Sequence, residues 1–201
     1  HTDFHTRRDS TEEYAQIIAD LTADRARNEL IVDEVGREVH GGSGVALVLS
    51  DRKGHCRELR ALLSERHGIS GTVLTGDTPL PERKDLVARI QEGREQVVFA
   101  TGQLIGEGFD ASNLTSLFLA TPVKFSGRLI QYLGRVLRPC AGKVQPKVYD
   151  FVDNRVGVLE SAGRARGLVY AELGTQNEKG CGSQAEHRMD TEQDRQETGD
   201  W

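Results

Sequence analysis

Three polar residues in the second half of the chain stand at a spacing that could bind phosphate. Gln131, Arg135 and Arg138 follow one another at i, i+4 and i+7, so on a helix they share one narrow face. Gly134 leaves room beside them for a ligand to approach. Two guanidinium groups that stay charged and point the same way suit the oxygens of a polyphosphate. Taken alone, the pattern fits a solvated surface helix better. The opposite face of that helix is apolar, with Leu129, Leu133, Val136 and Leu137.

A second candidate segment runs from residue 100 to 110 and is rich in glycine. It begins where an apolar run ends, and Thr101 there offers a hydroxyl, followed by backbone N–H groups that can face a phosphate. Gly108 permits a tight loop against a ligand, and Asp110 can accept a hydrogen bond from a ribose hydroxyl or hold an arginine. An ordinary strand-to-helix loop is an equally good interpretation of this segment by itself.

A third candidate is a basic turn that also follows an apolar run. Ser50 or Asp51 can cap a helix in which Arg52 and Lys53 occupy the first turn. Cations at that end oppose the helix dipole unless an anion is near, which favours a phosphate backbone as partner. A solvated basic turn is equally consistent with these residues. Thr75 and Gly76 follow another apolar run, and they indicate either a backbone contact or a simple turn.

The elements that must position these segments are short apolar runs alternating with amphipathic stretches. The pattern predicts strands at 45–49, 72–74, 97–100, 117–120 and 147–152, with helices at 52–67, 81–91, around the two arginines and at 155–173. Continuous apolar strands separated by helices indicate an α/β domain with a parallel sheet covered on both faces. Ligands of such folds gather at the carboxyl ends of the strands, where the candidate segments begin.

The two ends of the chain differ from this body, which spans residues 45–173. Residues 1–44 are predicted to be a helical lead-in, and Ser10 and Glu13 there have the spacing of a capping box. Residues 174–201 are polar and are expected to form a disordered tail. The absence of an initiator methionine suggests a piece of a longer protein.

Composition narrows the class of protein. A net charge of −5 argues against general nucleic-acid adhesion, although it leaves room for a local basic face. The three cysteines, Cys56, Cys140 and Cys181, are far apart and have no metal-binding spacing. They predict neither a disulfide framework nor a metal site, and a reducing cytoplasm is the expected setting. No apolar run approaches the roughly 18 residues of a membrane span, so no membrane partner is predicted.

Together these segments resemble the C-terminal RecA-like lobe of a superfamily 2 helicase. Residues 47–53 are similar to motif IV, residues 100–110 to motif V, and residues 131–138 to motif VI, in the same order and spacing. The resemblance covers about residues 45–173. Motif VI begins with Gln131 and is followed by Pro139, which resembles the DEAH-like, restriction-translocase and repair-helicase branches. DEAD-box proteins usually begin this motif with His.

The resemblance implies a three-layer RecA-like domain with a mostly parallel central sheet, and it assigns roles to the candidate residues. Arg135 and Arg138 would be arginine fingers reaching the γ-phosphate of ATP, worth roughly 10³ to 10⁵ in rate. Gln131 would place the phosphate or the attacking water. Gly108, Asp110 and Gly134 would line the nucleotide side of a cleft. The nucleic-acid backbone would be contacted by Ser50, Arg52, Lys53, Thr75, Gly76 and Thr101.

A phosphate-binding P-loop is missing, because no G-x-x-x-x-G-K-[ST] pattern occurs. Asp33 and Glu34 lie in a helical pattern and are predicted to be surface charge instead of a DExx box. ATP and Mg²⁺ would therefore be held mainly by an N-terminal RecA-like lobe elsewhere in a parent chain, and this chain alone is expected to be inactive. The resemblance makes DNA a stronger expectation than RNA as the nucleic-acid partner.

The sequence thus predicts the motor lobe of an ATP-dependent helicase or translocase, and two alternatives stay open. One is the translocase lobe of a type I or type III restriction enzyme, which no residue here supports or excludes. The other is a non-catalytic module that docks nucleic acid or protein, which the intact pair Arg135 and Arg138 disfavours. A dinucleotide-binding enzyme would need G-x-G-x-x-G after the first strand, and residues 50–54 do not supply it.

Overall fold

The computed structural model describes residues 1–42, 44–102, 113–123, 126–136 and 146–174. Its strands are β1 (Val45–Leu49), β2 (Thr72–Leu74), β3 (Val97–Ala100), β4 (Leu114–Leu119) and β5 (Lys147–Asp150). Its helices are α1 (Tyr14–Ala23), α2 (Arg25–Gly41), α3 (Lys53–His67), α4 (Leu80–Gln91), α6 (Ser126–Val136) and α7 (Gly157–Glu172). No helix within these ranges is both long and apolar enough to cross a membrane.

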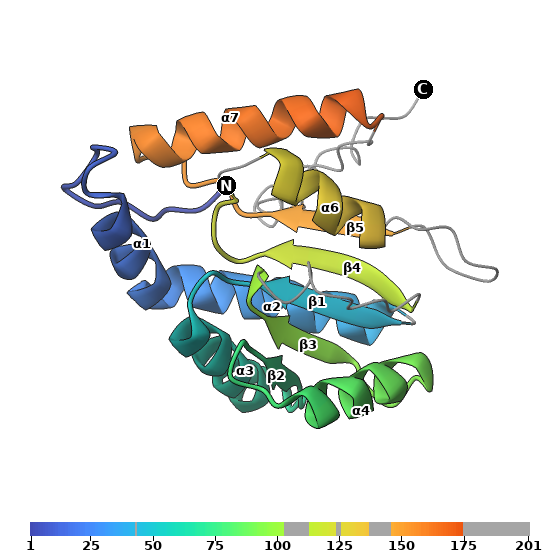
Figure 1. The fold of residues 1–201 in the computed structure, drawn as a ribbon. Helices are drawn as coiled ribbons and strands as arrows, with labels where there is room; N and C mark the ends of the chain where they lie inside the picture. The colour runs from blue at the N-terminus through green and yellow to red at the C-terminus, as the bar shows by residue number, and fades with distance from the viewer. Residues whose placement is uncertain (43, 103–112, 124–125, 137–145, 175–201) are drawn as a thin grey trace, which may run out of the picture.

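The five described strands form one parallel sheet in the order β2-β3-β1-β4-β5 (Figure 1). This confirms the predicted α/β class with helices around a parallel sheet. Because all five strands run the same way, their carboxyl ends meet at one edge. The chain places β2 and β3 on one side of β1 and then continues to β4 and β5 on the other. A parallel sheet whose order reverses in this way has its ligand crevice at that point, here between β1 and β4.

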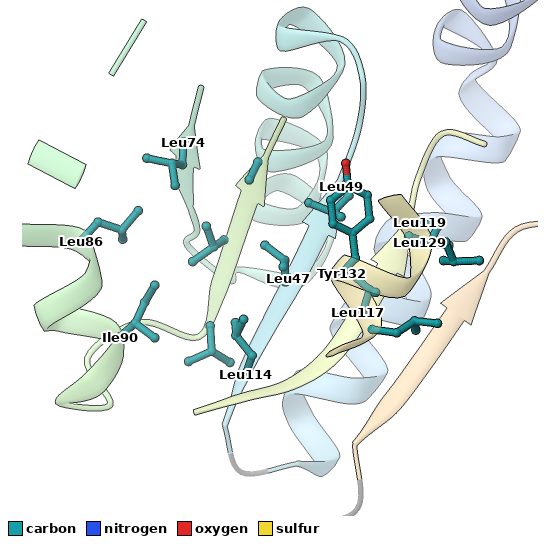
Figure 2. Close-up of a cluster of buried hydrophobic side chains, with 14 of the residues drawn as sticks. Leu47, Leu49, Leu74, Leu86, Ile90, Leu114, Leu117, Leu119, Leu129 and Tyr132 are labelled. Carbon is teal, nitrogen blue, oxygen red and sulfur yellow. The ribbon is translucent and has the colours of Figure 1, made fainter. Parts of the chain in front are cut away.

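The two faces of the sheet are buried by different helices, as alternation along a strand requires. In β1, Leu47 and Leu49 face a cluster completed by α4, α6 and α7. Figure 2 shows the part of this cluster that α4 and α6 contribute. Ala46 and Val48 face the other side, where α2 and α3 pack. Every residue of β1 is buried, which explains why the run shows no polar alternation in the sequence.

Within the predicted lead-in of residues 1–44, α2 forms part of the layer that covers the sheet. Ile31, Val32 and Val35 on this helix are completely buried against α3 and the strands. The carboxylate of Asp33, predicted to be surface charge, is hydrogen-bonded to Arg66 at 2.9 Å and to His67 at 2.8 Å on α3. These contacts join the two helices at the rim of the layer.

The capping-box pattern forms one turn ahead of the helix it was expected to start. The hydroxyl of Ser10 accepts the N–H of Glu13 at 3.3 Å and donates to the Glu13 carboxylate at 3.0 Å. Helix α1 begins after that turn, with Glu13 itself as N-cap and without a side-chain cap. The pattern therefore orders the turn that leads into the helix.

The fourth strand begins at Leu114, earlier than the predicted start at residue 117. Thr115 and Ser116 interrupt the apolar run in the sequence, yet the backbone there already pairs with β1, starting from Leu114 opposite Val45. The pairing partner, which the sequence pattern does not reveal, decides where this strand starts.

A buried ion pair fixes α2 to the carboxyl edge of the sheet. The side chains of Arg27 and Asp153 are 1% and 0% exposed, and Arg27 Nε lies 2.8 Å from Asp153 Oδ1. Arg27 also donates to the carbonyl oxygen of Ala120 at 2.7 Å, directly after β4. Thr2 donates its hydroxyl to the same carboxylate. The N-terminal segment, α2 and the ends of β4 and β5 are thereby held together.

Candidate functional site

The carboxyl edge of the sheet brings Ser50, Thr75 and Thr101 together. The N–H of Ser50 donates to the carbonyl of Ala100 at 3.1 Å, and the N–H of Thr101 donates to the carbonyl of Leu74 at 3.2 Å. The ends of β1, β3 and β2 are therefore direct neighbours. All three predicted residues are buried, and Thr101 is the most accessible of them at 9%. The backbones of these three residues line the carboxyl edge of the sheet.

The hydroxyl of Ser50 points into the protein, where it meets a buried histidine. Ser50 Oγ lies 2.9 Å from His55 Nδ1, and His55 Nε2 lies 2.8 Å from Asn28 Oδ1. Burial, with a smaller contribution from the nearby charge of Arg27, lowers the pKa of His55 to about 3, so the ring is neutral. The amide nitrogen of Asn28 donates to the carbonyl of Thr22, which turns its oxygen toward the ring. His55 therefore donates from Nε2 and accepts the Ser50 hydroxyl at Nδ1.

The same serine organises the basic turn. Ser50 Oγ accepts the N–H of Arg52 at 3.1 Å, just before α3 begins at Lys53. The N-cap of α3 is Arg52 and not Ser50, and no side chain among the described residues caps this helix, so none of them occupies its first N–H groups. An open cavity of about 410 Å³ lies here between α1 and the first turn of α3, and Arg52 and Lys53 line it. Glu58 lines the same cavity, so its carboxylate lies with the two cations and the helix N–H groups that suit an anion.

The cations of this turn already have partners. Lys53 forms an ion pair with Asp77, which belongs to the turn after β2. This contact lowers the pKa of the Asp77 carboxyl, chiefly through its hydrogen bond to Lys53. Arg52 donates to the carbonyl of Ala15 on α1 at 3.5 Å. Both cations are exposed, so a phosphate oxygen could replace either partner.

The turn that contains Thr75 and Gly76 is closed by its own hydrogen bonds. The N–H of Thr75 donates to Thr78 Oγ1 at 3.1 Å, and the N–H of Thr78 returns to the Thr75 carbonyl at 2.9 Å. Arg83 donates to the carbonyl of Gly76 at 3.0 Å. The ion pair between Asp77 and Lys53 places this turn beside the basic turn.

Helix α6 has the two-faced character that the spacing predicts. Leu129 and Leu133 are buried in the core, whereas Gln131 and Gly134 are exposed. Among the described residues, a Cβ at Gly134 would meet no atom within 4 Å. Arg135 lies on α6, but only its backbone is described. Arg138, Gly108 and Asp110 lie outside the described residues, so their predicted roles stay predictions.

Two further residues lie at this edge: Asp51, which the sequence offers only as a possible helix cap within the basic turn, and Tyr132, to which it gives no role. Asp51 lies at the switch point, where its N–H donates to Thr121 Oγ1 at 2.9 Å. Desolvation raises the pKa of its carboxyl, opposed by Arg128 and Arg52, although the residue as a whole is exposed. Tyr132 on α6 reaches the same place and is only 4% exposed. Tyr132 is next to Gln131 in the sequence, and this is the one sign that it belongs near the site. An aromatic residue at helical spacing more often indicates a core position.

The fold and this edge define a RecA-like α/β lobe, and comparison with known proteins agrees. The model of the family described as "Helicase conserved C-terminal domain" matches residues 26–140. The chain belongs to this family, and the predicted resemblance to a superfamily 2 helicase lobe is confirmed. Because the match begins at residue 26, it includes α2 and its buried Arg27.

Among curated proteins, "Putative ATP-dependent helicase IRC3" of Saccharomyces cerevisiae is 31% identical over 110 residues, 54% of this chain and 16% of that protein. "Transcript termination protein A18" of fowlpox virus is 25% identical over 146 residues, 70% of this chain and 30% of that protein. The chain thus spans less than a third of these relatives. Among solved structures, T4 UvsW superimposes with a TM-score of 0.63 at 21% identity, covering 79% of this chain and 35% of that one. This structural likeness shows the shared fold.

Proposed function

We propose that this chain is the C-terminal motor lobe of an ATP-dependent helicase or translocase. The observation that carries the proposal is the family match over residues 26–140, in a fold that gathers the ends of β1, β2 and β3 at one edge. The lobe would use this edge for nucleic acid and the exposed face of α6 for the phosphates of ATP. The parent protein would be a nucleic-acid-dependent ATPase.

The nucleotide half of the proposal rests on α6. Its buried leucines hold the helix on the sheet, while the exposed Gln131 and Gly134 would leave room for a phosphate. Arg135 and Arg138 would place their guanidinium groups against the γ-phosphate of ATP. Negative charge spreads over the oxygens of this group during phosphoryl transfer. ATP and Mg²⁺ would be held mainly by an N-terminal lobe of the parent chain. Among the described residues, no three His, Cys, Asp or Glu side chains gather to hold a metal.

The nucleic-acid half rests on the basic turn and its neighbours. Arg52 and Lys53 border a cavity at the start of α3, and the turn containing Thr75 and Gly76 lies beside it. Such groups recognise the phosphate backbone and carry no base-specific information. Binding would therefore have little sequence preference and would weaken as salt rises. The Gln-first motif at Gln131 resembles the DEAH-like, restriction-translocase and repair-helicase branches, and we propose DNA ahead of RNA on the strength of the last two.

The proposal is tested by ATP hydrolysis of the full-length parent protein in the presence of nucleic acid. Arg138→Ala is expected to lower the stimulated rate by about 10³-fold or more, the range measured for arginine fingers. The matched control is Arg164→Ala on α7, which removes an exposed arginine paired with Glu160 one turn away. Unchanged turnover in the Arg138 variant would refute the assigned role.

A further inference from the structure

The ring of Tyr132 lies against the backbone of Gly102, directly after the end of β3. A Cβ at Gly102 would lie 2.2 Å from the Tyr132 hydroxyl oxygen and 3.1 Å from Cζ. Contacts below 3 Å cannot persist, so a larger residue at position 102 excludes the present placement of the tyrosine. Figure 2 shows the ring extending from α6 toward Leu49, at the carboxyl end of β1. The two elements thus meet at the edge that carries the candidate site.

Other groups at this contact belong to the same edge. Asp51 Oδ1 lies 3.7 Å from the same Cβ position, which places the carboxylate beside the tyrosine hydroxyl. Burial, and then the charge of Asp51, raises the pKa of Tyr132, with Arg128 opposing, so the hydroxyl stays neutral. A neutral hydroxyl can donate or accept a hydrogen bond where the ends of β1, β3 and β4 come together.

The rest of Tyr132 belongs to the hydrophobic core. It packs in the cluster that contains Leu47, Leu49, Leu129 and Leu133, so its ring contributes to the docking of α6 on the sheet. Tyrosine combines a large apolar body with one polar tip. A phenylalanine would keep the apolar body and lose only the contact at the edge. Removal of the hydroxyl oxygen therefore separates the packing of the Tyr132 ring in the core from its contact with Gly102.

We propose that Tyr132 is a positioning residue that couples α6 to the backbone at Thr101 and Gly102. This inference rests on the function proposed above, in which Gln131 and Arg135 on α6 belong to the phosphate-binding motif and Thr101 contacts nucleic acid. A shift of the strand end on binding nucleic acid would be transmitted through the tyrosine to α6. The two sites would then respond to each other, because one rigid ring bridges the elements that carry them.

The test measures ATP hydrolysis by the full-length protein at rising concentrations of a single-stranded DNA oligonucleotide. Tyr132→Phe is expected to lower the ratio of stimulated to unstimulated rate by about threefold to tenfold, a coupling typical of residues in direct contact. Gly102→Ala is expected to lower this ratio further, because its methyl group collides with the hydroxyl. The double variant Gly102→Ala/Tyr132→Phe is expected to recover part of the loss, since the closest atom is gone. A ratio within one sample is insensitive to a loss of folded protein.

Gly127→Ala on α6 is the matched control, because a Cβ there meets no atom within 4 Å, and it should keep the wild-type ratio. A Tyr132→Phe protein with the wild-type ratio would overturn the inference and leave the proposed function intact. Failure of the double variant to exceed Gly102→Ala alone would also overturn it. Wild-type protein that no nucleic acid stimulates would overturn the proposed function and this inference together.

Discussion

The hydrogen-bonded series from Ser50 through His55 to Asn28 shows how a polar side chain at a strand end can serve the protein interior. All three residues are at most 3% exposed, and each polar atom in the series faces a partner. Buried polar groups are costly unless they are paired in this way. The series therefore holds the basic turn in place from the protein interior. A contact between the Ser50 hydroxyl and nucleic acid stays a prediction, and it would have to replace the contact with His55.

The neutral state of His55 predicts a loss of stability in acid. Its pKa is about 3 in the folded protein and near 6.5 when unfolded, so the unfolded state binds more protons below pH 6.5. Stability is therefore fully present above that pH and falls as the pH drops toward 3, by roughly 2 to 5 kcal/mol from this residue. Urea unfolding at pH 7, 6, 5 and 4 measures the effect. His55→Asn should be less stable at pH 7 and should show a flatter dependence; an unchanged slope would contradict the assignment.

Asp77 offers a second test at the scale of single residues. Its carboxylate occupies Lys53 at the proposed nucleic-acid site, so it competes with a phosphate for that cation. Asp77→Asn is expected to tighten binding of a single-stranded oligonucleotide by about twofold to fivefold, the modest range of an exposed ion pair. Fluorescence anisotropy at low salt gives the affinity. Asp85→Asn, which removes an exposed carboxylate paired with Arg89, controls for the change in net charge and should leave the affinity near wild type.

Among the elements, α6 is the one whose placement matters most, because it carries the proposed nucleotide contacts. It is held by a narrow buried face against β4 and α7, while its other face stays open. An element that is docked on one side and exposed on the other keeps its polar side chains in a defined direction. The predicted arginine face depends on this docking.

Truncation of the docked face should therefore be costly. Leu133 is 1% exposed, and Leu133→Ala is expected to destabilise the protein by about 2 to 5 kcal/mol through lost burial and a cavity. Ile130 on the same helix is 48% exposed, and Ile130→Ala should change stability by no more than about 0.5 kcal/mol. Urea denaturation compares the two. Equal effects from both substitutions would show that α6 is not docked as described.

The elements themselves were predictable to the extent that local pattern determines them. The strands at 45–49, 72–74 and 97–100 have the bounds that their apolar runs predict. Every residue of the first and third strands is buried, whereas in the second only Leu74 is. The predicted start of β4 is three residues too late, because backbone pairing with β1 defines where this strand begins and hydrophobicity does not. The prediction that the candidate segments meet at one edge of the sheet depends only on their positions after the strands.

Contacts between distant parts of the chain were beyond the sequence pattern. Arg27 and Asp153 are charged residues in a helix and after a strand, and nothing local marks them as a buried pair. Tyr132 and Gly102 likewise meet only after α6 packs on the sheet. Such pairs depend on tertiary structure, whereas periodicity reports the faces of single elements. The candidate motif residues can be proposed from their types and spacing alone, and their roles stay predictions.

At the scale of the whole molecule, a mildly acidic protein presents a local basic turn. Residues 174–201 hold seven Asp or Glu and three Lys or Arg, so they account for −4 of the net charge of −5, while Arg52 and Lys53 lie together at the start of α3. Local charge governs contacts within about a Debye length, near 10 Å at moderate salt. A net negative charge is therefore compatible with binding a phosphate backbone at one edge. Because this binding uses charged groups, the affinity for nucleic acid is predicted to fall as salt rises.

The proposed division of labour between two lobes leads to one direct measurement on the intact parent protein. ATP turnover, followed with and without single-stranded oligonucleotides of unrelated sequence, tests whether a nucleic-acid-dependent motor is present. The turnover is predicted to rise on addition of nucleic acid, to reach similar levels with each sequence, and to fall as salt increases. A rate that neither DNA nor RNA changes would contradict the assignment of this chain as a motor lobe.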